Sequence, residues 1–205
     1  EPARFLPGQF HLFDLPGAGR RAYSMANLAN EDGRLEFLIK YKPGGAASKV
    51  LFEELAAGAQ VLVEGPYGRG YLRPDPDRPL VAVAGGSGLA PMLSVVRAAR
   101  AGAANRSVTL YFGVNGPDEL FGSHELEALL DDGVDVRWVL REGAHPTRAE
   151  SVNGLVGDAM IAGEPTLSRK DLYLAGPAPM VEDVLRRTVR AGLISADRVF
   201  FDRFQ

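Results

Sequence analysis

The sequence predicts two domains, a small antiparallel β domain followed by an α/β domain built on a parallel sheet. Three observations support this prediction: short strand patterns in the first third of the chain, a proline-rich segment after them, and alternating strand and helix patterns in the remainder. The proline-rich segment, residues 73–79, holds three prolines in seven residues and is the predicted linker. We therefore expect one domain over residues 1–76 and another over residues 77–205.

The β domain is predicted from three segments with strand-like composition, separated by turn residues. These segments are residues 9–15, 34–40 and 60–64. The first ends at a Pro-Gly pair, and the second follows an Asp-Gly turn. Between the second and third segments, residues 48–57 have helical spacing, with Ser48 as the expected N-cap.

The α/β domain is predicted from the regular alternation that follows the linker. Strands are expected at residues 80–84, 107–114, 134–140, 171–175 and 198–204. Helices are expected at residues 89–101, 123–132, 154–162 and 178–191, the last of them stopped by Gly192. This alternation implies a parallel sheet with helices on both faces.

Composition excludes several classes of protein. The 205 residues carry a net charge of -3, which gives no electrostatic footprint for nucleic acid. No apolar run is long enough to span a membrane, and no signal peptide is visible, although the chain begins at Glu1 rather than at methionine. There is no cysteine, so these residues form no disulfide and ligate no iron–sulfur cluster. The histidines, His11, His124 and His145, have no ligand spacing, and we expect no metal.

The tetrapeptide Arg21-Ala22-Tyr23-Ser24 lies on an extended segment. Side chains two residues apart share a face of a strand, so Arg21 and Tyr23 project together. A guanidinium can hold a pyrophosphate through two hydrogen bonds, and a tyrosine ring offers a flat surface to a flavin. Ser24 faces the other way unless the strand ends or bulges there. A surface arginine beside a half-buried tyrosine explains the same residues, and both interpretations remain open.

Three glycine-containing segments can also contact a cofactor. Residues 44–48 open a helix, whose free amides attract phosphate. Residues 65–68, Gly-Pro-Tyr-Gly, form a tight turn that can close over a ligand. Residues 85–88, Gly-Gly-Ser-Gly, follow a strand and precede a helix, with Pro91 in its first turn, as a phosphate-binding loop requires. Ordinary turns and a helix cap are the alternative for each segment.

The motifs occur in a characteristic order along the chain. Arg-x-Tyr-Ser at 21–24 is followed by Gly-x-x-Ser at 45–48, Gly-Pro-Tyr-Gly at 65–68, Gly-Gly-x-Gly-x-x-Pro at 85–91 and Gly-Pro-x-x-Met at 176–180. Together they resemble the ferredoxin–NADP reductase superfamily over essentially the whole chain. Residues 7–10, 23–27, 33–39, 111–115 and 199–204 further resemble the reductase component of bacterial multicomponent monooxygenases, such as soluble methane monooxygenase reductase.

The resemblance implies that the first domain is an antiparallel β-barrel that binds FAD. Its implied contacts are Arg21, Tyr23, Ser24, Ile39, Lys40, Gly45, Ala46, Ala47, Ser48, Gly65 and Pro66. Arg21 would contact the FAD pyrophosphate, Tyr23 would stack on the isoalloxazine, and Ser24 would approach flavin N5. FAD is expected rather than FMN, because the helix start at Gly45 provides a second phosphate site. The family barrel has further strands before residue 7, so we expect this barrel to be partial.

The resemblance also implies that the second domain binds the nicotinamide nucleotide. Its implied contacts are Gly86, Gly88, Leu89, Ala90, Pro91, Asn115, Ala175, Gly176, Pro177, Met180 and Phe204. Asn115 stands where relatives often place an arginine for the 2′-phosphate, and Asp118 and Glu119 follow it, so we expect NADH. Ala175 replaces a cysteine that usually flanks the nicotinamide, which leaves the positioning of that ring open.

The C-terminal strand completes the expected catalytic set of Ser24, Asp202 and Phe204. Phe204 would shield one flavin face and yield it to the nicotinamide, and Asp202 would belong to a proton path. An apolar final strand with a frayed end is the alternative.

The resemblance implies an NADH-dependent flavoprotein reductase of the bacterial cytoplasm. It would transfer hydride from NADH to FAD and then single electrons to a [2Fe-2S] centre outside this chain, in a ferredoxin domain or protein. That centre would feed the hydroxylase component of a diiron monooxygenase. A stand-alone NADH:flavin or ferredoxin reductase is the alternative enzyme, and a module that binds nucleotides for regulation is the alternative outside enzymes.

Overall fold

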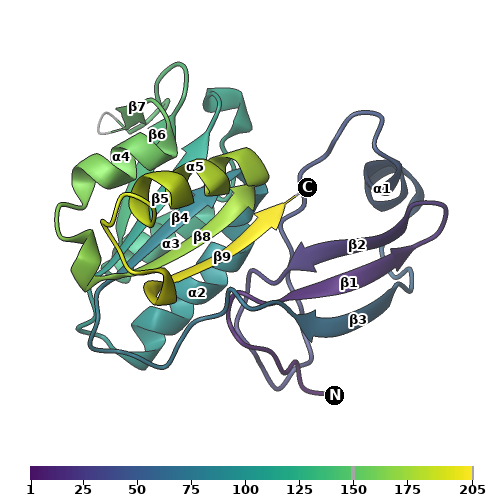
Figure 1. The fold of residues 1–205 in the computed structure, drawn as a ribbon. Helices are drawn as coiled ribbons and strands as arrows, with labels where there is room; N and C mark the ends of the chain where they lie inside the picture. The colour runs from purple at the N-terminus through teal and green to yellow at the C-terminus, as the bar shows by residue number, and fades with distance from the viewer. Residues whose placement is uncertain (149–150, 205) are drawn as a thin grey trace.

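The computed structural model describes residues 1–148 and 151–204, which form two lobes side by side (Figure 1). The first, here the antiparallel lobe, contains β1 (Phe10–Leu15), β2 (Gly19–Ser24), α1 (Ala46–Lys49), the π-helical η1 (Val50–Glu54) and β3 (Leu62–Tyr67). The second is the parallel-sheet lobe. Its strands are β4 (Leu80–Gly85), β5 (Val108–Val114), β6 (Asp135–Leu140), β7 (Val152–Asn153), β8 (Asp171–Pro177) and β9 (Val199–Phe204). Its α-helices are α2 (Leu89–Gly102), α3 (Ser123–Asp131), α4 (Val156–Gly163) and α5 (Ala178–Thr188). Short 3-10 turns occur at η2 (Gly86–Gly88), η3 (Pro117–Glu119), η4 (Leu167–Arg169) and η5 (Ala196–Arg198).

The antiparallel lobe has β1 at the centre of its sheet, paired with β2 on one edge and β3 on the other. Phe13 and Leu15 of β1 are buried with Val50 of the helical segment, because alternate residues of a strand face the same side. The Phe13 ring meets the rings of Tyr23 and Phe37 edge-on, with centroids 5.1 and 4.8 Å apart. This sheet and its small core confirm the predicted antiparallel β fold, as an open three-stranded sheet within the described residues rather than a closed barrel.

The strand predicted at residues 34–40 does not form in the structure. Its only bridge among the described residues is Met25 with Phe37. Next to that bridge, the Asn27 side chain takes the place of a neighbouring strand: its Nδ2 donates to the Arg34 carbonyl at 2.8 Å, and its Oδ1 accepts from the Glu36 N–H at 3.0 Å. The Arg34 carbonyl and the Glu36 N–H are thus satisfied by a side chain rather than by a β-ladder. The alternation of residues 34–40 does not reveal this side-chain contact.

Two further expectations for this lobe are wrong in detail. The helix begins at Ala46, with Gly45 as N-cap, so Ser48 lies inside it, and the Ser48 hydroxyl accepts a hydrogen bond from the Lys42 N–H at 2.8 Å. The third strand runs to Tyr67 instead of ending at residue 64, because Tyr67 pairs with Phe10 across the sheet. Gly65 and Pro66 therefore belong to a strand, where a tight turn was predicted.

The parallel-sheet lobe confirms the predicted alternation of strands and helices. Its strand order in the described residues is β7-β6-β5-β4-β8-β9, with every neighbouring pair parallel. The predicted strands and helices all occur, although α5 ends at Thr188, earlier than expected, and the two-residue strand β7 was not predicted. From β4 the chain runs through α2 to β5 on one side, whereas β8 lies on the other. Ligands of open parallel sheets bind beyond the strand ends at such a reversal.

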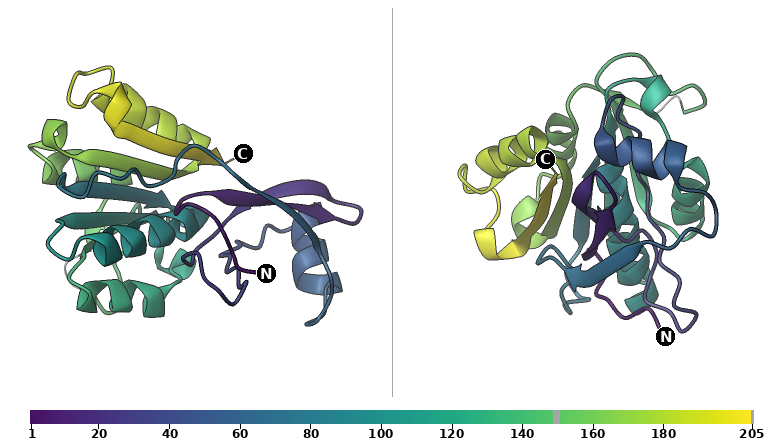
Figure 2. Two further views of the ribbon diagram at one scale, coloured as in Figure 1. Left: turned by 90° about the horizontal axis from the view of Figure 1, so that it is seen from below. Right: turned by 90° about the vertical axis from the view of Figure 1, so that its right-hand side faces the viewer.

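Helices cover both faces of this sheet, as Figures 1 and 2 show. Leu80, Ala82 and Ala84 of β4 pack with residues of α2 and α3 in one core cluster. Val81 and Val83 pack with residues of α4 and α5 in the other. All five side chains are almost fully buried, so β4 is apolar on both sides, as a central parallel strand must be.

Hydrogen bonds from the middle of α2 join the two lobes. The buried Ser94 hydroxyl donates a hydrogen bond to the Asn27 carbonyl at 2.7 Å, and the Arg97 guanidinium donates to the Ala26 carbonyl at 3.1 Å. The linker is also bound to the parallel-sheet lobe, because the Arg73 N–H donates a hydrogen bond to the Tyr173 hydroxyl of β8 at 2.9 Å. These contacts fix the lobes along the side of the molecule that carries the linker.

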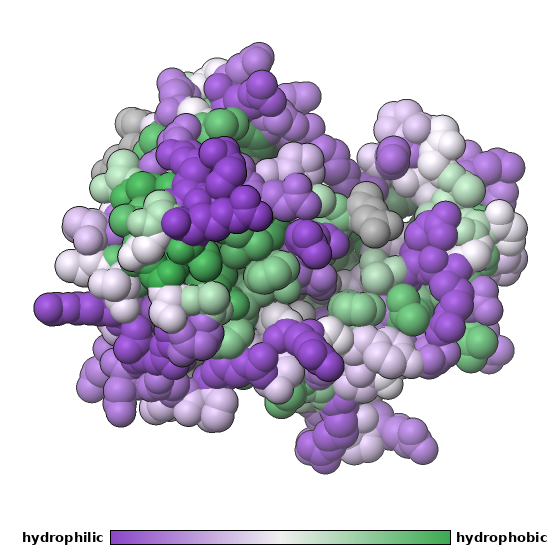
Figure 3. Space-filling view, in the orientation of Figure 1, coloured by the Kyte–Doolittle hydropathy of each residue, from purple (hydrophilic) through white to green (hydrophobic). Residues whose placement is uncertain are grey.

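The molecular surface is mixed in polarity. On the face drawn in Figure 3, the two lobes stand apart with an indentation between them, and apolar atoms gather over the segment between α5 and β9, where Leu193 is exposed. Among the described residues, no helix is long and apolar enough to cross a membrane.

Candidate functional site

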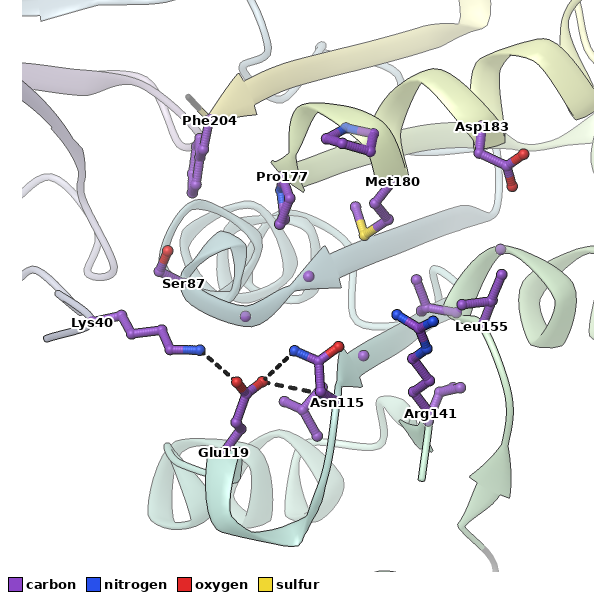
Figure 4. A pocket seen from close by; sticks show the side chains of 18 of the residues that line it. Lys40, Ser87, Asn115, Glu119, Arg141, Leu155, Pro177, Met180, Asp183 and Phe204 are labelled. Atoms are coloured by element: carbon purple, nitrogen blue, oxygen red, sulfur yellow. Dashed lines mark hydrogen bonds and ion pairs between the residues drawn. The ribbon is translucent and has the colours of Figure 1, made fainter. Parts of the chain in front are cut away.

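A pocket of about 810 Å³ opens at the carboxyl ends of the parallel strands. Its walls come from the ends of β4, β5, β6, β8 and β9 and from the loop of residues 40–43 in the antiparallel lobe. Figure 4 shows residues of both lobes around it. The pocket therefore lies at the reversal of strand order and between the two lobes, where a ligand can touch both.

Helix N-termini surround this pocket. In the described part of the chain, η2 with α2, α4 and α5 all begin at residues that line it: Gly86, Val156 and the Pro177–Pro179 segment. None of these N-termini has a side-chain hydrogen bond as a cap. Uncapped N–H groups and the positive ends of helix dipoles attract phosphate. The arrangement therefore fits the pyrophosphate of a dinucleotide.

The glycine loop after β4 leaves room for such a ligand. Gly86 has φ +52°, and a Cβ added to it would meet no atom within 4 Å, so the backbone is open on its pocket side. Gly88, in contrast, packs so tightly on β8 that a Cβ would collide with the Ala175 carbonyl. Gly86 exposes backbone to the pocket, and Gly88 lets the loop lie on the sheet.

The residues expected at the nicotinamide nucleotide fall into two groups. Gly86, Asn115, Pro177, Met180 and Phe204 line the pocket, and Lys40 joins them from the flavin set. Leu89, Ala90, Pro91 and Ala175 are buried in the packing of α2 on the sheet. Gly88 and Gly176 lie against the backbone of Ala175 and Gly85. The second group shapes the pocket through the backbone and offers it no side chain.

Except for Lys40, the residues expected at the flavin lie on the antiparallel lobe outside the lining of this pocket. Arg21 and Tyr23 share one face of β2, opposite Phe13 and His11, as predicted from their spacing. Tyr23 is half-buried against Phe13, and burial raises the pKa of its hydroxyl. Ser24 is buried at the end of the strand. Arg21 is exposed, and within the described residues it forms no ion pair.

The phosphate-binding helix start expected at residues 45–48 fits a flavin dinucleotide. The α1 N-terminus has no side-chain cap, and Gly45, Ala46 and Ala47 leave its first N–H groups without bulky side chains beside them. Gly65 and Pro66 are exposed on β3, and Ile39 is half-buried just before Lys40. The Arg21 guanidinium donates to the Arg20 carbonyl at 2.9 Å but has no carboxylate partner within the described residues. This guanidinium and the uncapped helix start suit an anionic group, so the residues present fit FAD.

The C-terminal strand brings Asp202 and Phe204 to the interface of the lobes. Phe204 lines the pocket across from Ser87 (Figure 4). Gly70 lies against the backbone of Phe201 and Asp202, which ties the loop after β3 to this strand. Burial raises the pKa of the Asp202 carboxyl, so this group holds a proton more readily than an exposed aspartate.

A polar network at the rim of the pocket was not predicted. Glu119 accepts hydrogen bonds from the Asn115 N–H at 3.1 Å, from Asn115 Nδ2 at 3.0 Å and from Lys40 Nζ at 2.8 Å. The hydrogen bond from Lys40 is the main reason why the pKa of Glu119 is lowered. From the sequence, Glu119 was expected only to add negative charge near Asn115. Its ion pair with Lys40 could not be predicted, because the two residues are 79 positions apart.

Arg141 was also missed, and it corrects one premise of the sequence analysis. NADH was expected partly because no cation was found near Asn115, but Arg141 at the end of β6 lines the pocket with Asn115. The same two residues border a second pocket of about 520 Å³, which Asp118 and Glu142 also line. The end of the neighbouring strand was the place to search for this cation, since parallel strands end at the same edge.

Comparisons with known proteins agree with this geometry. The chain matches the family model "Oxidoreductase FAD-binding domain" over residues 2–71 and the model "Oxidoreductase NAD-binding domain" over residues 82–186. It is 58% identical over 204 residues to the ferredoxin–NAD(+) reductase component of the alkene monooxygenase system of Xanthobacter autotrophicus, covering 99% of this chain and 62% of that protein. It is 34% identical over 212 residues to the reductase component of propane 2-monooxygenase of Rhodococcus jostii, covering all of this chain and 57% of that protein.

Among solved structures, the ferredoxin reductase of carbazole 1,9a-dioxygenase superposes with a TM-score of 0.89 at 32% identity, covering all of this chain and 62% of that one. The chain therefore spans about three fifths of the length of the relatives that it matches.

Proposed function

Because the chain belongs to the ferredoxin reductase family of FAD- and NAD-binding oxidoreductases, we propose that it is the flavin- and nucleotide-binding part of an NADH-dependent reductase. Its acceptor is the iron–sulfur centre of a ferredoxin domain or protein, and its setting is a bacterial oxygenase system. The observation that carries the proposal is the pocket between the lobes, where uncapped helix N-termini and the open glycine loop face Phe204.

The two lobes have separate tasks in this proposal. Residues 1–76 hold FAD, with Arg21 and the α1 N-terminus on its phosphates and Tyr23 against its ring system. Residues 77–205 hold NADH, with its pyrophosphate on the loop at Gly86. Bound FAD supplies the chemistry of accepting a hydride and releasing single electrons. The chain positions the two ring systems and keeps water out, and Phe204 covers the place where they meet.

The finer partner follows from the relatives. Alkene and propane monooxygenase systems contain the two relatives named above, and we assign this chain to a monooxygenase of the same kind, with a hydroxylase as the final acceptor and the bacterial cytoplasm as its location. A stand-alone NADH:flavin reductase is the second candidate. Weak and exchangeable flavin binding would favour it, since the free flavin would then be the product.

An anaerobic titration tests the proposal. The purified chain is mixed with FAD, separated from unbound flavin and titrated with NADH while the visible spectrum is recorded; a [2Fe-2S] ferredoxin is then added. We expect retained yellow colour, bleaching by a stoichiometric amount of NADH, and reduction of the ferredoxin. Flavin that is retained but not bleached by NADH would contradict the reductase assignment. Bleaching without ferredoxin reduction would favour the second candidate.

A further inference from the structure

An exposed ion pair links the two lobes at the rim of the nucleotide pocket. Lys40 Nζ lies 2.8 Å from Glu119 Oε1, and both residues line the pocket (Figure 4). Lys40 follows the extended segment of residues 34–39 in the antiparallel lobe, whereas Glu119 ends the turn η3 in the parallel-sheet lobe. The pair thus connects the lobes at the pocket, in addition to the buried Ser94–Asn27 hydrogen bond.

The Glu119 side of this pair is held firmly. Its carboxylate accepts from both the backbone N–H and the side-chain amide of Asn115, and the Glu119 N–H itself donates to the Gly116 carbonyl at 3.1 Å. Only about a quarter of the Glu119 side chain is exposed, against about half of Lys40 (26% and 54%). Glu119 is therefore the fixed partner, and Lys40 is the long side chain that it orders.

Lys40 begins the loop of residues 40–43, which forms one wall of the pocket. The rest of that loop is tied to its own lobe: the Tyr41 hydroxyl donates to Glu53 at 3.0 Å, and the Lys42 N–H donates to the Ser48 hydroxyl at 2.8 Å. Among the described residues, Lys42 has no carboxylate partner. The hydrogen bond from Lys40 to Glu119 is thus the contact that ties this wall to the opposite lobe.

We propose that Glu119 is a positioning residue, which acts through its ion pair with Lys40 to hold the loop of residues 40–43 in place as a preformed wall of the nucleotide pocket. The inference rests on the proposed function, since it assumes that NAD(H) occupies this pocket. A preformed wall raises affinity because the ordering cost is met before the ligand arrives. A partly exposed pair contributes little free energy, so the effect is modest and sensitive to salt.

A double-mutant cycle separates this role from a direct contact of Lys40 with a ligand phosphate. The variants are Glu119→Gln, Lys40→Met and the double variant Glu119→Gln/Lys40→Met. The probe is NAD⁺, measured by calorimetry on the full chain. Exposed pairs are typically worth up to about 1 kcal/mol, so we expect each single variant to weaken binding about two- to fivefold. The double variant should be no weaker than the worse single one.

Lys42→Met is the matched control, because it removes a charge from the same wall without breaking an ion pair. Its effect should multiply with that of Glu119→Gln, whereas the effect of Lys40→Met should not. The difference between wild type and Glu119→Gln should also shrink at high salt. Multiplying effects of Lys40→Met and Glu119→Gln would overturn the inference.

A second measurement needs no nucleotide. Chymotrypsin cleaves after exposed aromatic residues, and the bond after Tyr41 lies in the wall. The exposed Tyr67 of β3, outside the wall, is the internal reference. Cleavage after Tyr41, relative to Tyr67, should accelerate in both Glu119→Gln and Lys40→Met. Unchanged cleavage would overturn the inference while leaving the proposed function intact. Wild type that binds no NAD⁺ but shows these cleavage rates would refute the function and leave the role of the pair standing.

Discussion

The Ser94 hydroxyl in α2 donates a hydrogen bond to the Asn27 carbonyl in the other lobe at 2.7 Å, and Ser94 is completely buried. The same Asn27 uses its side chain to bind the backbone of Arg34 and Glu36. One asparagine therefore supports an extended segment of its own lobe and receives the main buried contact from the other. Since the pocket lies between the lobes, its width depends on this contact.

Replacement of Ser94 by alanine should destabilise the protein. The variant leaves the Asn27 carbonyl buried without its donor, and such a loss costs about 1–3 kcal/mol. Denaturant unfolding followed by circular dichroism measures it as a lower midpoint with an unchanged slope. Ser123→Ala is the control, because Ser123 is exposed at the start of α3; it should stay within about 0.5 kcal/mol of wild type. Equal midpoints for the two variants would show that the contact does not fasten the lobes.

The parallel-sheet lobe could be predicted from the sequence because its central strands, β4, β5 and β8, are buried on both faces and alternate with segments of helical spacing. Val81 and Ala82 face opposite cores and are both fully buried, which only a central strand requires. Such patterns are local, so they need no knowledge of the partner. The expected order of the motifs also placed Gly86, Pro177 and Met180 at one pocket.

The errors have the opposite origin, in contacts between distant residues. The alternation at residues 34–40 is that of a strand, but a strand needs a ladder, and Asn27 supplied the hydrogen bonds instead. Ser48 had the residue type of an N-cap, but its hydroxyl is used by Lys42. Arg141 and Glu119 reach the pocket from the parallel-sheet lobe, and Lys40 reaches it from the antiparallel lobe. Because these residues come from separate segments, no residue spacing within one segment predicts that they meet.

The partly buried carboxyl of Asp202 should make stability depend on pH. Burial raises the pKa of Asp202, so the folded state binds the proton more tightly than the unfolded state, and stability falls as pH rises from the ordinary aspartate value through the raised one. Asp202→Asn removes this loss. The melting temperature of the variant should match wild type in acid and exceed it at neutral pH, in thermal melts recorded from pH 4 to pH 7.

Asp197 provides a control of opposite sign. A hydrogen bond from the Ser195 hydroxyl lowers the pKa of this exposed carboxyl, so its contribution is present at neutral pH and is lost as pH falls through the lowered value. Asp197→Asn should therefore be slightly less stable than wild type at neutral pH and equal to it in acid. Burial of Asp202 disfavours its charged carboxylate in this interpretation. The interpretation would be wrong if Asp202→Asn, like Asp197→Asn, lowered the melting temperature at neutral pH.

The choice between NADH and NADPH should depend on the carboxylates around Arg141. Asp118 and Glu142 line the second pocket with that arginine, so two negative charges face one positive charge where Asn115 joins the two pockets. A 2′-phosphate there would be repelled.

Asp118→Asn/Glu142→Gln should raise the ratio of kcat/KM for NADPH to that for NADH about tenfold, which corresponds to about 1.4 kcal/mol. Steady-state kinetics with both nucleotides measures the ratio, and Asp32→Asn, exposed on the other lobe, should leave it unchanged. An unchanged ratio in the double variant would place the 2′ position elsewhere.

Alanine substitution should impair the protein at both glycines of the loop after β4, but through stability at Gly88 and through nucleotide binding at Gly86. In Gly88→Ala the new methyl group collides with the Ala175 carbonyl, so the loop must leave the sheet; we expect a loss of about 1–3 kcal/mol or more in the free energy of unfolding.

In Gly86→Ala the methyl group meets no protein atom, and the left-handed backbone costs about 1–2 kcal/mol. Gly86 lines the pocket, however, so we expect the added methyl group to occupy space through which a pyrophosphate would reach the backbone. NAD⁺ affinity per folded molecule should therefore fall at least tenfold in Gly86→Ala, a larger drop than its loss of stability explains. Gly102→Ala, at the far end of α2 with nothing within 4 Å, should bind NAD⁺ as wild type does. Wild-type affinity in folded Gly86→Ala would move the pyrophosphate away from this loop.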